Sequence, residues 1–247
     1  MHLRLLPCVL IFSACGAPLP AQTSPDYVGT ADRPAARGMD EAANGTNPRL
    51  YGSLEDGVYT APGKTFQIKI PVLEELGGDI ADTPNTVTFD DNSDVHINIG
   101  VFPLTPQLKA ELDSRGIKNF LIYYFSTFIL PDYGKAFPGA RLEEDAFFTT
   151  KCQNGAIFLY LLLPGGSHFE QQTRFTPNIP IPPVVGKRGN VCFIRSGSVF
   201  IVSVELADRA IQRSTYNRPA AEENVILRKR LTDLLDKMSF PAPENRH

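Results

Sequence analysis

The chain has 247 residues, a formal net charge of −3 and a hydrophobic content of 43%, with 10% aromatic residues. This composition is typical of a packed globular domain and excludes a largely disordered or fibrous chain. No global basic excess is present, so we expect no nucleic-acid partner.

The chain begins with a pattern that is typical of an export signal. Arg4 supplies a positive charge, and residues 5–14 form the apolar run LLPCVLIFSA. These ten residues are too few to span a bilayer, which takes about 20 apolar residues, but they suit the hydrophobic region of a secretory signal. We therefore predict a signal peptide over residues 1–14.

The segment IFSACG, residues 11–16, resembles a bacterial lipobox. Ser13 and Ala14 are the small residues that precede Cys15, whereas Phe12 stands where Leu is usual. The motif requires Cys because its sulfur carries the diacylglyceryl group, and two or more acyl chains, palmitate among them, hold a protein stably in a membrane. The alternative is an ordinary signal peptide that is cut at a nearby small residue.

The resemblance to a lipobox implies a lipoprotein anchored through Cys15. Gly16 follows the cysteine, in place of the Asp that would retain a lipoprotein in the inner membrane. By analogy, we expect the protein in the cell envelope, on the outer membrane and facing the periplasm. Residues 15–50 are rich in Ala, Pro and Gly and lack apolar periodicity, which predicts a flexible linker. We predict one folded domain over residues 51–240, followed by a tail at 241–247.

The domain is predicted to begin with a hairpin of two short strands, residues 58–60 and 66–70. In the second strand Phe66, Ile68 and Ile70 alternate with polar residues. This alternation indicates a strand with one buried side and one side that faces water.

The same alternation returns in residues 94–101, after a short predicted strand at 86–89. The branched aliphatic residues of this segment share one side, which we expect to be buried. His96 and Asn98 fall on the other side, which we expect to face water.

Two helices are predicted next. Thr105 and Pro106 are typical of a helix start, and Gly116 is typical of a helix end. Residues 118–130 carry a broad apolar stripe, which predicts a second helix packed on a sheet. Pro131 is expected to end it.

The second half of the domain combines strands with a long loop and a final helix. Residues 140–150 and the apolar run 156–163 predict strands, the latter covered on both faces. The Pro-rich residues 167–187 predict a surface loop of the kind that often carries function. A hairpin is predicted over residues 191–206, and leucines at helical spacing predict a helix over 219–238.

The order of these elements resembles the PsbP-like superfamily, which includes extrinsic photosystem subunits, a Ran-binding import factor and bacterial lipoproteins. The motifs that carry the resemblance are Tyr59, the segment FQIKIP at residues 66–71, the run 156–163, the hairpin 191–206, and residues 227–240, which close on Ser-Phe. The family's usual Trp is missing because the chain contains no Trp.

The resemblance covers most of residues 57–240, and the loop 167–187 looks inserted. It implies an α/β/α sandwich on a mainly antiparallel sheet, with an amphipathic C-terminal helix. It also implies a binding or assembly role more than catalysis, and no catalytic residue is carried over.

Two cysteines remain in the domain, Cys152 and Cys192, because Cys8 leaves with the signal and Cys15 is the predicted lipid site. An exported domain lies in an oxidising compartment, where an even pair is typical of a disulfide. Two buried free thiols would give the same sequence pattern, so both alternatives remain open.

An acidic segment raises the question of calcium. Asp90, Asn92 and Asp94 alternate as in the first half of an EF-hand loop, but Val95 and Val101 occupy the positions of its Gly and Glu. We interpret the segment as a polar turn between two strands, and a weak structural calcium site is the alternative.

The histidines of the domain are His96 and His168, and neither has a Cys, Asp or Glu at metal-ligand spacing in the sequence. His168 belongs to the segment His-Phe-Glu beside two glycines, which would form a polar corner of a loop. The chain contains no nucleophile elbow, phosphate loop, His-Glu-x-x-His or Cys-x-x-Cys motif. We expect no catalytic residue, metal site or cofactor.

The sequence thus predicts a lipid-anchored envelope accessory protein, without catalytic activity, that docks another protein through its Pro-rich loop or an open sheet face. The alternative is a small-ligand or lipid-binding domain with a pocket between sheet and helices. An exposed apolar patch at residues 179–183 would favour protein docking. Converging acids and histidines in one cleft would instead favour an enzyme.

Overall fold

An eight-stranded antiparallel sheet forms the middle layer of the structure, a computed structural model that describes residues 50–143, 146–169 and 184–240. The strand order is β4-β5-β6-β11-β10-β9-β7, and β8 also pairs with β9. The strands are β4 (Asp79–Asp82), β5 (Thr86–Asp90), β6 (His96–Pro103), β7 (Arg141–Leu142), β8 (Phe147–Thr149), β9 (Ala156–Pro164), β10 (Val185–Arg195) and β11 (Ser198–Glu205).

A second, four-stranded sheet joins the beginning of the domain to its end. It consists of β1 (Ser53–Glu55), β2 (Val58–Thr60), β3 (Gln67–Lys69) and β12 (Met238–Ser239), in that order. The predicted hairpin is confirmed as β2 and β3, and its second strand, β3, also pairs with β12, which follows the last helix. Short 3₁₀ turns at Pro62–Lys64 and Glu74–Leu76 lie beside these strands.

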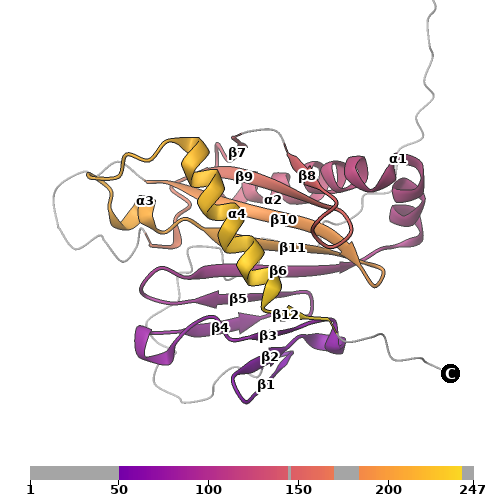
Figure 1. Ribbon diagram of the computed structural model, residues 1–247, viewed down its shortest axis with the longest axis horizontal. Coiled ribbons are helices and arrows are strands. Elements are labelled where there is room, and N and C mark those ends of the chain that lie inside the picture. Colours follow the sequence, from indigo (N-terminus) through magenta and orange to yellow (C-terminus); the bar gives the residue numbers. More distant parts are fainter. Residues whose placement is uncertain (1–49, 144–145, 170–183, 241–247) are drawn as a thin grey trace, which may run out of the picture.

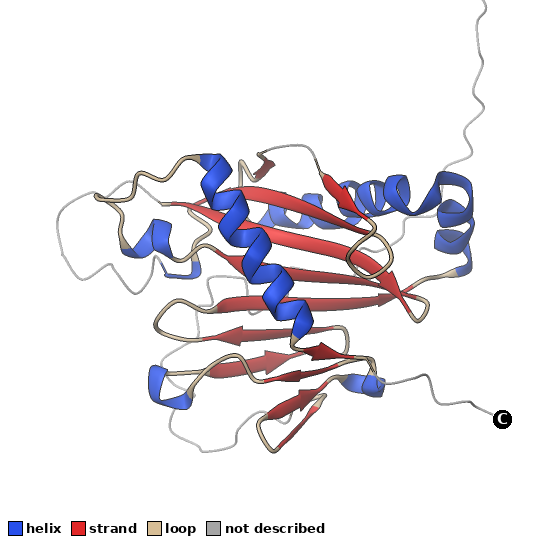
Figure 2. Ribbon diagram, in the orientation of Figure 1, coloured by secondary structure: helices blue, strands red, loops and turns tan. Residues whose placement is uncertain are grey.

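Helices cover both faces of the central sheet (Figures 1 and 2). One face carries α4 (Ala220–Asp236), which runs diagonally across the strands, and the short α3 (Asp208–Ile211) lies at one end of the sheet. The other face carries α1 (Pro106–Tyr124), the π-helical segment Phe125–Ile129 and α2 (Leu130–Ala136). This arrangement confirms the predicted α/β/α sandwich on an antiparallel sheet.

The helix boundaries follow local chemistry, with one correction. The Thr105 side chain accepts a hydrogen bond from the backbone N–H of Leu108, as predicted for an N-cap, and Gly116 interrupts α1 with a positive φ of 70°. Pro131 does not end the helical path, contrary to prediction. It lies in the first turn of α2, where its missing backbone N–H costs no hydrogen bond. The π-helical segment before it joins α1 to α2, so the chain stays helical across this position.

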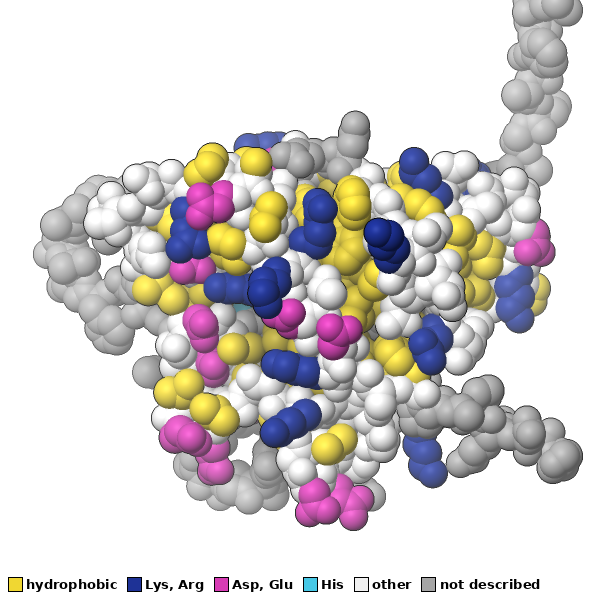
Figure 3. Space-filling model, in the orientation of Figure 1, with side chains coloured by type: hydrophobic (Ala, Val, Ile, Leu, Met, Phe, Trp, Pro, Cys, Tyr) yellow, Lys and Arg dark blue, Asp and Glu magenta, His cyan; other side chains and the backbone are white. Residues whose placement is uncertain are grey.

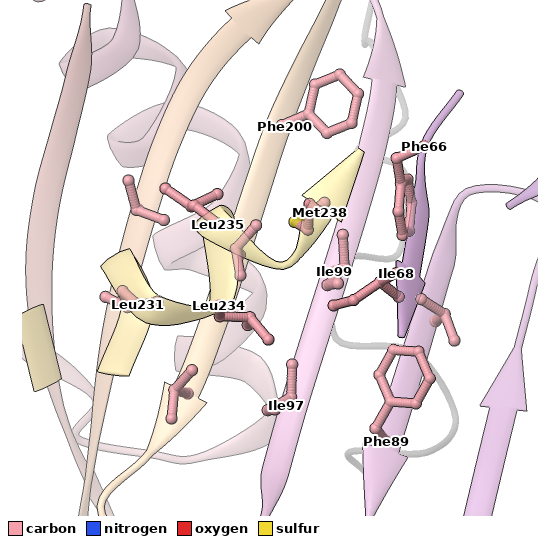
Figure 4. Close-up of a cluster of buried hydrophobic side chains, with 14 of the residues drawn as sticks. Phe66, Ile68, Phe89, Ile97, Ile99, Phe200, Leu231, Leu234, Leu235 and Met238 are labelled. Atoms are coloured by element: carbon pink, nitrogen blue, oxygen red, sulfur yellow. The ribbon is translucent and has the colours of Figure 1, made fainter. Parts of the chain in front are cut away.

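Two hydrophobic cores lie on opposite faces of the central sheet. The first lies between the sheet, α4 and the small sheet, and Figure 4 shows Ile97 and Ile99 of β6 beside Ile68 of β3 and the leucines of α4. The second lies between the sheet, α1, the π-helical segment and α2. Strand β9 contributes to both cores, so the predicted two-sided burial of residues 156–163 is confirmed.

The predicted solvent-facing side of β6 is in fact buried. His96 and Asn98 are each 1% exposed. Alternation correctly separates them from the aliphatic residues, but their side of the sheet is covered too, by α2 and by residues 167–169. Tyr133 of α2 approaches Ser203 of β11 with 3.4 Å between the hydroxyl oxygens, and the His168 ring stacks on His96.

The long predicted loop at 167–187 is shorter than expected at its end, because residues 185–187 begin β10. Residues 170–183, which include the predicted apolar patch at 179–183, lie outside the described residues. So do the predicted signal peptide, Cys15, the linker and the tail. Within the described ranges, no helix combines the length and apolar character needed to cross a bilayer.

A buried ionic cluster attaches α4 to the sheet. The ammonium group of Lys187 on β10 is fully buried and lies 2.9 Å from Oε2 of Glu223 on α4, with the Glu143 carboxylate on its other side. Glu223 Oε1 accepts hydrogen bonds from Arg209 Nε at 2.8 Å and from the Tyr216 hydroxyl at 2.7 Å. Burial alone would raise the pKa of Glu223, but these hydrogen bonds and cations outweigh it and lower the pKa.

Charges of both signs interleave on the face that carries α4 (Figure 3). Two of its basic side chains, Lys229 and Arg218, lie 2.5 Å and 3.7 Å from carboxylates four residues further on, Asp233 and Glu222. Such exposed pairs contribute little stability. The basic end of the chain is therefore a solvated face with acidic partners beside its cations.

We predict that Glu223→Gln lowers the free energy of unfolding by about 3 kcal/mol at pH 7, because Lys187 loses a buried counter-charge. The pKa of Glu223 is lowered from 4.5 by folding, so its ionised form stabilises the fold above that pH. This contribution is lost as the pH falls through the folded-state pKa. The difference between wild type and variant should therefore shrink below pH 4.5.

Chemical denaturation of both proteins between pH 3.5 and 7 measures this difference, with Glu222→Gln as the matched control. Glu222 is the preceding residue and its side chain is 54% exposed, so its loss should change stability by less than about 1 kcal/mol. Equal effects of the two substitutions would contradict the structural role given to the cluster.

Candidate functional site

Asp90 and His96 lie directly opposite each other where β5 ends and β6 begins. The antiparallel register pairs the two residues, and Asp90 Oδ1 is in hydrogen-bond contact with His96 Nδ1. Their neighbours Phe89 and Ile97 belong to the first core, so strand alternation turns this pair to the opposite face of the sheet. The pair therefore faces the layer that contains α2.

His168 joins this pair from the segment that follows β9. Its ring is stacked on that of His96, with centroids 4.6 Å apart and planes 15° from parallel. His168 Nε2 lies 4.0 Å from Asp90 Oδ1, and the Phe169 ring packs nearly perpendicular to the imidazole, with centroids 5.2 Å apart. One nitrogen or oxygen atom from each of Asp90, His96 and His168 lies within 4.8 Å of the others.

A buried carboxylate fixes the backbone at His168. Glu205, at the end of β11, accepts the His168 backbone N–H through Oε2 at 3.1 Å and the Ser167 hydroxyl through Oε1. Arg188 of β10 stands opposite Glu205 in the ladder, and its Nη2 lies 3.6 Å from Oε2. Glu205 and Arg188 are 1% and 2% exposed, so His168 is held by a buried ion pair.

The turn between β5 and β6 is organised by Asp91. Its Oδ1 accepts the backbone N–H groups of Ser93, Asp94 and Val95 at 2.8, 2.8 and 2.9 Å. Asp94 is exposed, whereas the Asp90 carboxylate points to the histidines. These acids diverge, so the structure agrees with a polar turn and does not gather them as calcium ligands.

The site leaves His168 and Asp90 within reach of solvent. Their side chains are 28% and 20% exposed, whereas His96 is 1% exposed. Burial, and then the neighbouring His96, lower the pKa of His168 from 6.5, while Asp90 and Glu205 act in the opposite direction. The balance favours a neutral His168 imidazole at pH 7, which carries a free lone pair.

A row of buried polar side chains continues from the site across the sheet beneath α2. Thr88, Asn98, Ser203 and Asn190 stand opposite one another on successive strands. Asn98 donates to Thr88 at 2.9 Å, but its Oδ1 and both polar side-chain atoms of Asn190 have no hydrogen-bond partner within the described residues. Buried amides need partners, which ordered water or a polar ligand supplies.

The predicted Cys152–Cys192 disulfide is not formed, and both residues are free thiols. Cys192 lies in the core between the sheet and α1, whereas Cys152 packs against the core on the other face. The sheet separates the two sulfurs, so the alternative of two free thiols describes this fold. Burial raises the pKa of both thiols.

Sequence spacing missed this site because its residues are brought together by folding. Asp90 and His96 meet through the antiparallel register, and His168 arrives from a distant loop, so the expectation that neither histidine has a ligating neighbour is corrected. Glu205 was also missed, although a signal existed. Ser203 and Glu205 interrupt the apolar strand SVFIVSVE at alternate positions, which places both on one face.

Comparison with known proteins gives similarities of fold only. No family model and no curated protein matches the chain. Among solved structures, cyanobacterial PsbP from Synechocystis matches with a TM-score of 0.46 and 10% identity, over 81% of this chain and 99% of that chain. The Saccharomyces cerevisiae Ran-binding protein Mog1p matches with 0.43 and 9%, over 76% and 96%.

These two proteins share a PsbP-like fold. A third match, from Bacteroides thetaiotaomicron, has a TM-score of 0.35 and 9% identity, over 78% of this chain and 52% of that chain. At such identities the ligands and partners of these proteins do not transfer to this chain.

We predict that Asp91→Ala lowers the free energy of unfolding by about 2 kcal/mol, because three backbone N–H groups lose a charged acceptor. Thermal or chemical unfolding of the variant measures the loss. Asp94→Ala is the matched control on the same turn, and its exposed side chain should leave stability within about 0.5 kcal/mol of wild type. A loss in the control as large as in Asp91→Ala would contradict the assigned role.

Proposed function

We propose that this chain is an exported, lipid-anchored binding domain that holds a small ligand at the Asp90–His96–His168 site. The observation that carries the proposal is the convergence of one carboxylate and two imidazoles at the end of the central sheet. His168 and Asp90 remain partly exposed, which gives a ligand access, while Glu205 and the β5–β6 register hold the groups in place. Pre-organised groups of this kind favour binding.

Converging acids and histidines are also what an enzyme needs, so the choice of binding over catalysis depends on the nucleophiles. Ser167 donates its hydroxyl to Glu205. Burial raises the pKa of Cys152 and Cys192, which keeps both thiols protonated. Ser167 does contact a carboxylate, but both side chains are buried and Glu205 is also bound by Arg188 and by the His168 backbone N–H, so we assign this contact a structural role.

A lipid anchor on Cys15 would place this binding domain in the envelope. Cys15 within the lipobox-like segment and the linker over residues 15–50 support a domain that is tethered to the outer membrane and faces the periplasm. Docking of another envelope protein through the Pro-rich loop or an open sheet face is the first expectation from the sequence, and an exposed apolar patch at residues 179–183 would favour it. Those residues lie outside the described part of the chain, so docking remains a prediction without a structural observation in its favour.

We predict that the protein expressed in a Gram-negative host carries a lipid-sized mass increase and partitions with membranes. Cys15→Ser should abolish both, because the thioether to the diacylglyceryl group cannot form. Intact-mass spectrometry and membrane fractionation measure these outcomes, and Cys152→Ser, in the folded domain, is the matched control. An unmodified wild-type chain in the periplasmic fraction would contradict the anchor.

We predict that a screen of small ions and polar metabolites by thermal unfolding finds a ligand that stabilises the full chain. A ligand at 100 times its Kd stabilises by about 2.7 kcal/mol, which corresponds to roughly 5–10 °C in Tm for a domain of this size. Asp90→Asn should abolish the shift, and Asp94→Asn should retain it. If no ligand acts through Asp90 and crosslinking instead captures an envelope protein, the docking alternative replaces this proposal.

A further inference from the structure

The geometry points to a divalent transition-metal ion of the Zn²⁺ class as the ligand of this site, bound by Asp90, His96 and His168. This inference rests on the proposed function and gives it a chemical class of ligand. It also goes beyond the sequence, where no metal spacing connects the three residues.

The separations of the ligating atoms suit a single ion. Zn²⁺ lies about 2.0–2.2 Å from imidazole nitrogen and carboxylate oxygen, so two ligands of a tetrahedral ion are about 3.3–3.6 Å apart. His168 Nε2 and Asp90 Oδ1 are 4.0 Å apart and approach by about 0.5 Å to reach this separation. All three atoms lie within 4.8 Å of one another. To bind one ion, the Asp90–His96 hydrogen bond has to open and the stacked imidazoles have to tilt, because imidazole binds a metal through its in-plane lone pair.

Neighbouring residues fix the three ligands in position, as outer residues do around metal sites in proteins. Asp90 and His96 are fixed by the β5–β6 ladder, and the Asp91 carboxylate fixes the turn between them. Glu205 fixes His168 through the backbone N–H at 3.1 Å, and Arg188 neutralises Glu205 in turn. Such outer groups orient ligands and contribute to metal affinity.

The donor set selects among metals. Two imidazole nitrogens and one carboxylate oxygen suit Zn²⁺, Ni²⁺ or Cu²⁺, whereas Ca²⁺ and Mg²⁺ take oxygen ligands. Asp91 is engaged with three backbone N–H groups and Asp94 is exposed, so the neighbouring carboxylates do not complete an oxygen cage. Three protein ligands beside partly exposed His168 and Asp90 leave a fourth position for water.

The competing explanation is structural. A buried Asp–His hydrogen bond with a second imidazole stacked on it is a stable polar contact without any metal. The two explanations differ in what they require of His168. A metal site needs its Nε2 as a ligand, whereas a structural contact needs only its ring, so His168→Phe keeps the stacking and removes the nitrogen.

The test uses the full chain without a polyhistidine tag, purified in detergent and stripped of metal by a chelator. Zn²⁺ affinity is measured by competition with a chromophoric chelator, and Co²⁺ reports the coordination of the site through its visible absorption. We expect one Zn²⁺ per chain. Asp90→Asn and His168→Phe should each weaken binding by more than about 100-fold, since loss of an outer-shell group alone costs 10–100-fold.

Two controls match these variants. Asp94→Asn removes an exposed carboxylate from the same turn, and His247→Ala removes a histidine of the terminal tail. Both should bind Zn²⁺ as the wild type does, and excess Ca²⁺ or Mg²⁺ should not displace the ion. Near-ultraviolet circular dichroism confirms that each variant is folded, and imidazole NMR signals of His96 and His168 should shift with Zn²⁺ in the wild type.

The inference is overturned if the folded wild type binds no Zn²⁺, or if Asp90→Asn and His168→Phe bind it unchanged. Its failure differs from a failure of the proposed function. If an organic ligand stabilises the chain through Asp90 while Zn²⁺ does not bind, the binding function stands and the metal is wrong. If neither acts through these residues, both are wrong and the stacked histidines are structural.

Discussion

Two adjacent buried cations on β10 determine how both faces of the sheet are occupied. Successive residues of a strand point to opposite sides, so Lys187 meets Glu223 of α4 while Arg188 meets Glu205 beneath the other layer. A shift of one residue in register would turn each cation to the opposite face and disrupt both ion pairs, at a cost of several kcal/mol. The site depends on this register because Glu205 holds the backbone of His168.

The same alternation separates the packing role of β6 from its binding role. Ile97 and Ile99 fill the first core, which α4 closes, and His96 and Asn98 turn to the second layer. That layer reaches over them because the helical path continues through the π-helical segment past Pro131. A helix that ended at Pro131 would leave Tyr133 and the contact with Ser203 unformed. The cover over the polar row therefore depends on this irregular segment.

Periodicity predicted the elements well and the site poorly, for a physical reason. Apolar spacing indicates which side chains share a face, and it gave the hairpin of β2 and β3, the doubly buried β9 and α4 within one or two residues. It does not indicate whether the second face is covered, so it predicts a solvent-facing His96 although this side chain is buried. Pairing between distant segments, as for His168 and Cys192, depends on register and topology.

The buried polar residues of the second face are the strongest reason to expect a ligand there. A domain that needed only stability would gain from apolar side chains under α2, because buried amides and charges cost free energy unless they are fully paired. Here Asn98 and Asn190 keep polar atoms without protein partners in the described residues, beside a carboxylate and two imidazoles. Buried polar residues that break the expected packing pattern are typical of functional sites. On this face the buried polar residues run from the end of the sheet where β5 meets β6 across to Asn190 on β10. A metal ion at the β5–β6 end would stabilise the carboxylate and imidazoles there, which are costly to bury without a partner.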